Sequence, residues 1–232
     1  MYRPLDRSRV QWTVVIALLL LAATAPSAVR AQTDNITTTR HNFSVLSGRA
    51  AGFTTLTGVA DYGEICVYCH TPHGGSTTAP LWNRAFGVGP YLMYTSPSIN
   101  MVIAAAPGAV SLACLSCHDG TIGIDVITNR PNASTATSLG ATMATLFPTG
   151  PGAFKNLGAD LRNDHPIGVT FSTADAAFNT QASIVTAGLP FYGAASDRME
   201  CATCHNPHNN TNSPFLRRTN VGSALCLTCH IK

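Results

Sequence analysis

The chain has 232 residues, enough for one or two domains, and its formal net charge is only +3. Its basic residues form no patch or stripe, which argues against a nucleic-acid-binding protein. Although 45% of the residues are hydrophobic, 19 glycines and 14 prolines are spread throughout the chain, and its hydrophobic periodicity is weak. The side chains alone are therefore expected to form a poor hydrophobic core, so that another group must fill the interior.

Residues 1–31 have the three parts of a secretory signal peptide. Basic residues begin the segment, an uncharged and mostly apolar run follows from Thr13 to Ala25, and Val29-Arg30-Ala31 offers the small residues at which a signal peptidase cleaves. We expect cleavage after Ala31, which removes four arginines and one aspartate and leaves a neutral chain. The alternative is a retained membrane anchor, but the apolar run is shorter than the roughly 20 residues that span a bilayer.

All eight cysteines fall in four Cys-x-x-Cys-His units (CxxCH), which is the attachment signature of c-type haem. Residues three apart on a helical turn share a face, so both sulfurs can form thioethers with one porphyrin, and the adjacent histidine then lies below the iron. Four covalently attached c-type haems are therefore predicted. The attachment residues are Cys66, Cys69, Cys114, Cys117, Cys201, Cys204, Cys226 and Cys229, and the proximal ligands are His70, His118, His205 and His230.

Three other chemistries use paired cysteines, namely zinc sites, structural disulfides and redox dithiols. Each would explain one Cys-x-x-Cys pair. Four pairs that are each followed by histidine, with no cysteine left over on an exported chain, favour haem instead.

Four histidines lie outside the CxxCH units, which equals the number of sixth ligands that four irons need. They are His41, His73, His165 and His208. Because axial ligands are a main control that a protein has over haem, the matched count predicts four bis-His irons. Methionines are the alternative ligands, although packing is their commoner role; they are Met93, Met101, Met143 and Met199.

Two of these histidines stand three residues after a proximal histidine, in Cys-His-Thr-Pro-His and Cys-His-Asn-Pro-His. Ligands on opposite faces of one haem have Cα atoms on the order of 12 Å apart, given metal–nitrogen bonds of roughly 2 Å. Three residues span at most about 10–11 Å. His73 and His208 are therefore expected to reach a neighbouring haem, which would hold two porphyrins close together.

The chain divides into two dihaem halves, 32–150 and 151–232, each with an upstream histidine, a CxxCHxPH unit and a plain CxxCH unit. Within each half the second haem is the expected acceptor, so His73 is assigned to the Cys114/Cys117 haem and His208 to the Cys226/Cys229 haem. The first and third haems are left for His41 and His165. Each histidine either serves its own half, or His165 serves the first haem while His41 reaches the third haem of another molecule.

The predicted fold is mostly irregular coil with short helices and few short strands, a multihaem cytochrome c in which the haems form the core. The CxxCH units are expected on short helical turns. Two short β-branched runs, Ile122–Ile127 and Ile167–Phe171, suggest local hairpins. The stretch Pro131–Gly158 is rich in Ser, Thr, Gly and Pro and is predicted to be a loop between the halves.

The motifs that carry a family resemblance are His41-Asn-Phe-Ser, Cys-His-Thr-Pro-His, Cys-Leu-Ser-Cys-His-Asp-Gly, Asn163–Gly168 and the final Cys-Leu-Thr-Cys-His. With them the chain resembles the doubled-CxxCH multihaem cytochromes, and most of all the extracellular tetrahaem cytochromes that polymerise into conductive filaments. The resemblance covers most of the mature chain through its haem motifs. It implies electron transfer through a continuous chain of bis-His haems, with one sixth ligand donated by the adjacent subunit.

Such a donated ligand is a head-to-tail contact, which propagates into a homopolymer unless a ring closes. His41 is the expected donor, because it lies on a Thr-rich arm near the mature N-terminus. Other redox proteins or extracellular acceptors are the remaining expected partners, with no nucleic acid and no membrane anchor. The expected location is extracellular or at the cell surface, and periplasmic if the protein stays monomeric.

Three other functions compete with a polymeric conduit. One is a monomeric periplasmic electron shuttle, and another is a membrane quinol dehydrogenase that keeps residues 12–25 as its anchor. The third is a haem enzyme, which needs an open coordination position on an iron. Four spare histidines for four irons leave no such position, so the chain is predicted not to be an enzyme.

Overall fold

The computed structural model describes residues 35–45, 57–79, 81–131, 134–149, 155–172 and 174–232. The predicted signal peptide lies outside the described residues, as do the membrane-anchor alternative and parts of the predicted loop. The described residues belong to one compact unit made mostly of coil and turns. Among them, no helix has both the length and the apolar character needed to cross a membrane.

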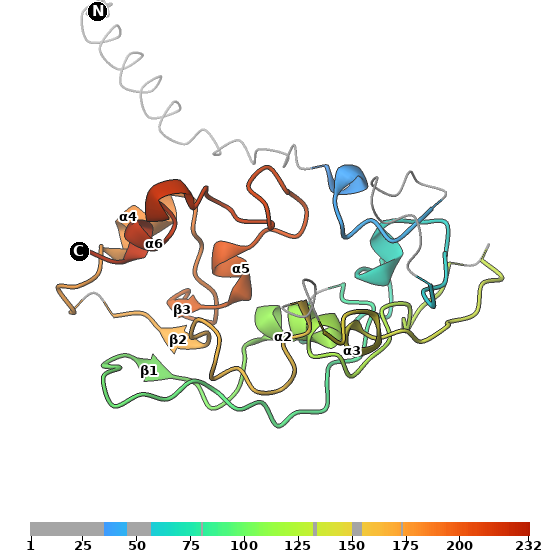
Figure 1. Ribbon diagram of the computed structural model, residues 1–232, viewed down its shortest axis with the longest axis horizontal. Coiled ribbons are helices and arrows are strands. Elements are labelled where there is room, and N and C mark those ends of the chain that lie inside the picture. The colour runs from blue at the N-terminus through green and yellow to red at the C-terminus, as the bar shows by residue number, and fades with distance from the viewer. Residues whose placement is uncertain (1–34, 46–56, 80, 132–133, 150–154, 173) are drawn as a thin grey trace, which may run out of the picture. The chain divides into compact units, whose positions relative to one another are not determined.

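The helices and strands of the described residues are short (Figure 1). In chain order they are η1 (Ile36–Thr38), η2 (Cys66–Tyr68), β1 (Val102–Ile103), α2 (Ala109–His118), α3 (Met143–Leu146), β2 (Val169–Thr170), α4 (Gln181–Thr186), β3 (Arg198–Met199), α5 (Cys201–Cys204), η4 (Val221–Ser223) and α6 (Cys226–Cys229), where η marks a 3-10 helix. The prediction of mostly coil with short helices and few strands is confirmed.

Each CxxCH unit lies on a helical turn, as predicted. The first unit begins on η2, the second ends α2, and the third and fourth occupy α5 and α6. The chain leaves α5 and α6 at the proximal histidine, because His205 and His230 already have extended backbone angles. The helical turn therefore places both cysteine sulfurs on one side, and the backbone turns away from them at the proximal histidine.

The three strands form one antiparallel sheet in the order β1-β2-β3, in which Val169 pairs with Ile103 and with Met199. The predicted run Ile167–Phe171 does contain a strand, but its partners are distant in sequence, so it is not a local hairpin. The other run, Ile122–Ile127, contains no strand. Its carbonyl groups at Gly123 and Ile124 accept hydrogen bonds from a buried arginine instead of a neighbouring strand.

The predicted loop between the halves contains a short helix that the sequence argument missed. Thr142 caps the N-terminus of α3 by accepting a hydrogen bond from the Thr145 backbone, and Thr145 returns one from its hydroxyl to the Thr142 carbonyl. Met143, the first residue of α3, is buried. A short cap motif and one buried side chain are enough to form this helix within a polar stretch.

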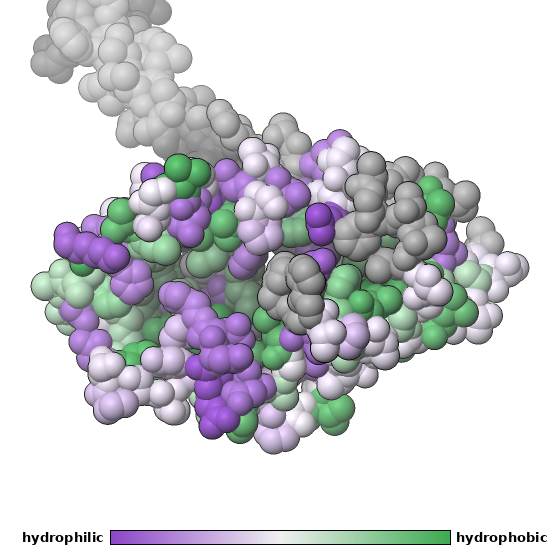
Figure 2. Space-filling model, viewed as in Figure 1, coloured by the Kyte–Doolittle hydropathy of each residue, from purple (hydrophilic) through white to green (hydrophobic). Residues whose placement is uncertain are grey.

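The polypeptide builds two small hydrophobic clusters of buried side chains. The larger contains Phe43, Val59, Ala60, Tyr62, Val67, Tyr68, Ile124 and Met143. The smaller contains Ile184, Leu189 and Phe191. Cys69 and Cys117 pack against the first cluster and Cys229 against the second. Figure 2 shows hydrophobic residues interspersed with hydrophilic ones over the visible face, and large apolar side chains such as Val88 are exposed.

Asp125 is the polar centre of the larger cluster. Its fully buried carboxylate accepts hydrogen bonds from the backbone N–H groups of Ala60 (2.8 Å), Leu139 (2.6 Å) and Gly140 (3.0 Å) and from the Ser138 hydroxyl (3.0 Å). Burial by itself raises the pKa of Asp125, but these donors outweigh it and the net shift is downward from 3.8. The charged carboxylate thus joins three segments of the first half.

The depressed pKa of Asp125 predicts how stability depends on pH. Its contribution to the free energy of unfolding should be complete above the unfolded-state pKa of 3.8 and should be lost as the pH falls through the lower folded-state value. Urea unfolding of the haem-loaded protein should therefore show a fall in stability below about pH 4. In Asp125→Asn this fall should be shallower, and stability at pH 7 should drop by about 1–3 kcal/mol because backbone donors lose a charged acceptor.

The control for this measurement is Glu64→Gln, which removes an exposed carboxylate. Its stability should follow the pH dependence of the unmodified protein. An Asp125→Asn protein with an unchanged acid limb would show that another carboxyl group governs acid unfolding.

Candidate haem-binding sites

Three pairs of histidine rings have centroid separations close to those of two axial ligands on one iron. Two imidazoles on one iron should have ring centroids about 6.3 Å apart, from metal–nitrogen bonds of about 2 Å and a ring radius of about 1.1 Å. The observed separations are 6.1 Å for His70 and His208, 6.2 Å for His41 and His118, and 6.5 Å for His165 and His230. The three spacings therefore fit an iron held between each pair.

Backbone carbonyl groups orient several of these rings. The Nδ1 atoms of His41 and His118 lie 3.3 Å and 2.7 Å from the carbonyl oxygens of Pro207 and Lys155. His165 and His205 make the same contact, at 3.1 Å and 3.0 Å, with Pro166 and Pro214. A histidine that donates Nδ1–H to a carbonyl keeps Nε2 available, which is the usual arrangement around a metal ligand.

Burial favours the neutral form, which binds a metal, at several of the ligand histidines. Burial and the neighbouring His118 lower the pKa of His41 to about 4. Burial also lowers the pKa of His70, His118 and His205, with neighbouring histidines adding to the effect at His70 and His118. The buried Nδ1 of His70 has no hydrogen-bond partner among the described residues.

The cysteines of successive units lie near one another. Cys114 and Cys201 are within hydrogen-bonding contact, and α2 packs against α5. Cys117 acts electrostatically on Cys69, and Cys229 and Cys226 act on Cys204. Figure 1 shows the same sequence of elements, from α6 through α5 and α2 to the η2 segment. The four CxxCH units therefore follow one another in the order of the chain.

None of the eight cysteines is joined to another in a disulfide. The described part of the chain contains no group of three or more His, Cys, Asp or Glu side chains that could hold a metal ion. The structure thus has paired cysteines beside paired histidines, which is the donor set that haem attachment requires.

The axial pairs differ from those assigned from sequence. His208 faces His70 of the first unit instead of His230, and His41 faces His118 of the second unit. His165 faces His230 of the fourth unit. The sequence argument assigned His73 and His208 within their own halves, but the segment after α5 folds back onto the first half. There Phe215 stacks on His41, with ring centroids 4.4 Å apart.

Two histidines remain without a facing ring among the described residues. His73, assigned from sequence to the second haem, is exposed, and only its backbone carbonyl has hydrogen-bond partners. His205 is the proximal ligand of the third unit, also exposed, and its ring is already oriented through Nδ1. The third unit is thus the one whose proximal histidine has no opposing imidazole in this arrangement.

Two of the methionine alternatives pack in hydrophobic clusters. Met143 lies in the larger hydrophobic cluster, and Met199 packs against the smaller one. The Met93 methyl group lies 3.2 Å from where a Cβ on Gly168 would stand.

Sequence reasoning missed two buried charged residues beside the attachment cysteines. Arg84 and Glu200 are both 2% exposed. Arg84 acts electrostatically on Cys69 and Cys117, and Glu200 directly precedes Cys201. The only sequence signal for Glu200 is its place before a CxxCH unit. Arg84 has no sequence signal, because its burial depends on how the Ile122–Ile127 segment folds against it.

The model of the doubled CXXCH motif family matches residues 194–232, which contain the third and fourth units. A comparison with curated proteins gives no match. The family match and the motifs support a multihaem c-type cytochrome with covalently attached haem that takes part in electron transfer.

Proposed function

We propose that the protein is an exported tetrahaem c-type cytochrome that carries electrons outside the cell along a continuous chain of bis-His haems. The observation that carries the proposal is the set of three imidazole pairs at 6.1–6.5 Å, each containing the proximal histidine of a different CxxCH unit. Bound haems would supply the redox chemistry, and these histidine pairs would hold their irons. The polypeptide attaches, spaces and shields the haems, and the contact between Cys114 and Cys201 supports close approach of neighbouring ones.

We further propose that the subunits join head to tail, and that the joining ligand is His73 instead of His41. His73 is exposed and has no facing ring, whereas His41 is engaged with His118 and Phe215. His205 offers the complementary end, an oriented proximal ligand without an opposing imidazole. One copy would then complete the third haem of the next, and the contact would repeat into a filament because it is heterologous.

A separate subunit has a distinct chemistry under this proposal. Its third iron would have one open position, whereas the other three would be closed by histidine pairs within the chain. An open position on haem iron binds small ligands and is where haem catalysis occurs. Assembly would therefore close the one position that could otherwise make the protein an enzyme.

The test is a comparison of assembled and dissociated wild-type protein. Electron microscopy of material sheared from cells should show filaments. Their haems should all be low spin, with no carbon monoxide bound after reduction. Dissociated subunits should bind carbon monoxide at one haem in four. Complete low-spin ligation in a dilute monomer would instead mean that His73 serves its own chain, and would favour the monomeric shuttle.

A further inference from the structure

The chain has two glutamates, and each stands just before a CxxCH unit. Glu64 precedes Cys66 by two residues and is exposed, whereas Glu200 precedes Cys201 directly and is 2% exposed. Water screens an exposed charge strongly, but a buried charge acts on its surroundings through a medium of low dielectric constant. The two carboxylates therefore differ in how far they influence a haem attached beside them.

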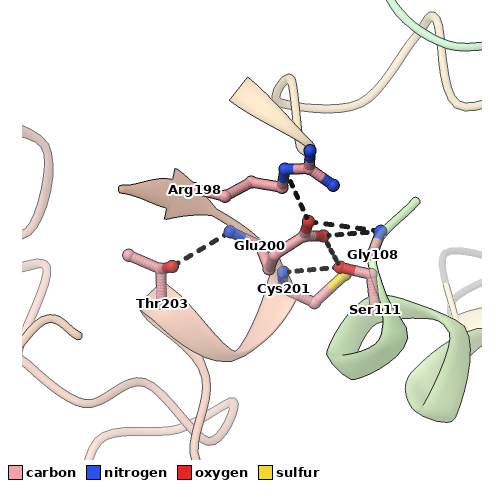
Figure 3. Close-up of polar contacts among 6 residues, drawn as sticks. All are labelled: Gly108, Ser111, Arg198, Glu200, Cys201 and Thr203. Carbon is pink, nitrogen blue, oxygen red and sulfur yellow. Dashed lines mark hydrogen bonds and ion pairs between the residues drawn. The ribbon is translucent and has the colours of Figure 1, made fainter. Parts of the chain in front are cut away.

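Glu200 is held by contacts from both sides of the junction between α2 and α5 (Figure 3). The backbone N–H of Gly108, at the N-terminus of α2, lies 3.2 Å and 3.3 Å from its two carboxylate oxygens. The Ser111 hydroxyl donates to the same carboxylate and accepts from the backbone N–H of Cys201 at 3.0 Å. A Cβ at position 108 would meet the Glu200 carboxylate, so a larger residue there would displace it.

The positive groups around Glu200 do not fully neutralise its negative charge. The guanidinium of Arg198 approaches to 3.9 Å, and its side chain is 35% exposed, so solvent screens this pair. The N-terminus of α2 adds only a partial positive charge. Part of the negative charge of Glu200 therefore remains effective within the protein.

Glu200 lies at the junction of two haem-attachment sites. It adjoins Cys201 of the third unit, and its partner Ser111 lies one helical turn before Cys114 of the second unit. Cys114 and Cys201 are themselves in contact. Both thioether edges would therefore meet beside this carboxylate. The second unit has another buried carboxylate, Asp119, but it directly follows His118 at the opposite end of α2.

We propose that Glu200 lowers the reduction potentials of the second and third haems and so sets the electron-transfer equilibrium at the centre of the haem chain. This inference rests on the proposed electron-transfer function. One electron moves between two haems, so that one ferrous iron becomes ferric and one ferric iron becomes ferrous, with no bond broken and no proton moved. A buried negative charge favours the ferric state, because that state carries one more positive charge.

The test is a spectroelectrochemical titration of the four-haem protein and of Glu200→Gln. Glutamine keeps an oxygen acceptor for Gly108 and Ser111 but removes the charge. At least one of the four one-electron steps should move to higher potential, by on the order of tenfold in its equilibrium constant, which is about 59 mV. The matched control Glu64→Gln, at the exposed glutamate, should leave all four steps unchanged.

A second variant keeps the proposal testable if Glu200→Gln does not load haem. Arg198→Gln removes the opposing positive charge and should shift the same steps to lower potential. The proposal is overturned if assembled Glu200→Gln retains four low-spin haems and its titration coincides with that of the unmodified protein. Where Glu200→Gln does not load haem, the same result for assembled Arg198→Gln overturns it. An assembled wild-type protein without four bis-His haems would instead overturn the proposed function, so the two failures are distinguishable.

Discussion

His73→Ala is expected to abolish filaments while leaving haem attachment intact. The variant keeps every CxxCH unit, so each chain should still carry four haems by haem-content assay. It loses the exposed imidazole that we assign to the third haem of the next subunit, so that iron should become high spin. Electron microscopy should show only dispersed particles, and absorption spectra should show one haem in four changed.

Two comparisons make the His73 experiment specific. In His41→Ala the second haem should become high spin because His118 loses its facing ring, yet filaments should still form. Adding imidazole to His73→Ala should restore the low-spin spectrum without restoring filaments. Free imidazole can occupy the open coordination position of the iron but does not link two subunits. Intact filaments in His73→Ala, or their loss in His41→Ala, would return the joining role to His41.

Arg84→Met is expected to destabilise the first half of the protein severely. The buried guanidinium donates to the carbonyls of Ser116 (3.1 Å), Gly123 (2.7 Å) and Ile124 and to the Ser116 hydroxyl (3.3 Å). Methionine fills similar space but leaves these acceptors buried without donors, and each unsatisfied group costs about 1–3 kcal/mol. We expect a loss of about 3–5 kcal/mol in the free energy of unfolding.

Urea unfolding of the haem-loaded protein measures this loss, with Arg218→Met at an exposed arginine as the control. The control should lie within about 0.5 kcal/mol of the unmodified protein, as surface substitutions usually do. Arg84→Lys should be intermediate, because an ammonium has three donors and cannot reach all four acceptors in the fork geometry of arginine. If Arg84→Met were as stable as Arg218→Met, the Arg84 hydrogen bonds would not hold the Ile122–Ile127 segment.

The helical turns that carry the CxxCH units were predictable because they depend on local spacing. Two cysteines and a histidine on one helical turn define the unit wherever it lies, and η2, α2, α5 and α6 all present it in this way. The absence of long elements was predictable from composition as well. The β-branched run at Ile122–Ile127 was misleading, because Arg84 satisfies its carbonyls in place of a partner strand.

The axial pairs were not predictable because they depend on how distant segments fold together. The reach argument correctly required His208 to leave its own unit, but it had no means of choosing the direction. The choice is made by the segment after α5, where Phe215 stacks on His41 and the Pro207 carbonyl meets its Nδ1. Tertiary contacts of this kind leave no periodic or motif signal in the chain.

The pairing of His70 with His208 has a consequence for maturation. An iron bound by both would cross-link an early and a late part of the chain, as a disulfide does. In the chain-entropy model, closing a loop of roughly a hundred residues or more lowers the entropy of the unfolded state by an amount worth about 5 kcal/mol. This cross-link can form only after the late segment has been synthesised and exported. Truncation before residue 208 would therefore leave the first haem attached but would remove the cross-link between the two parts of the chain.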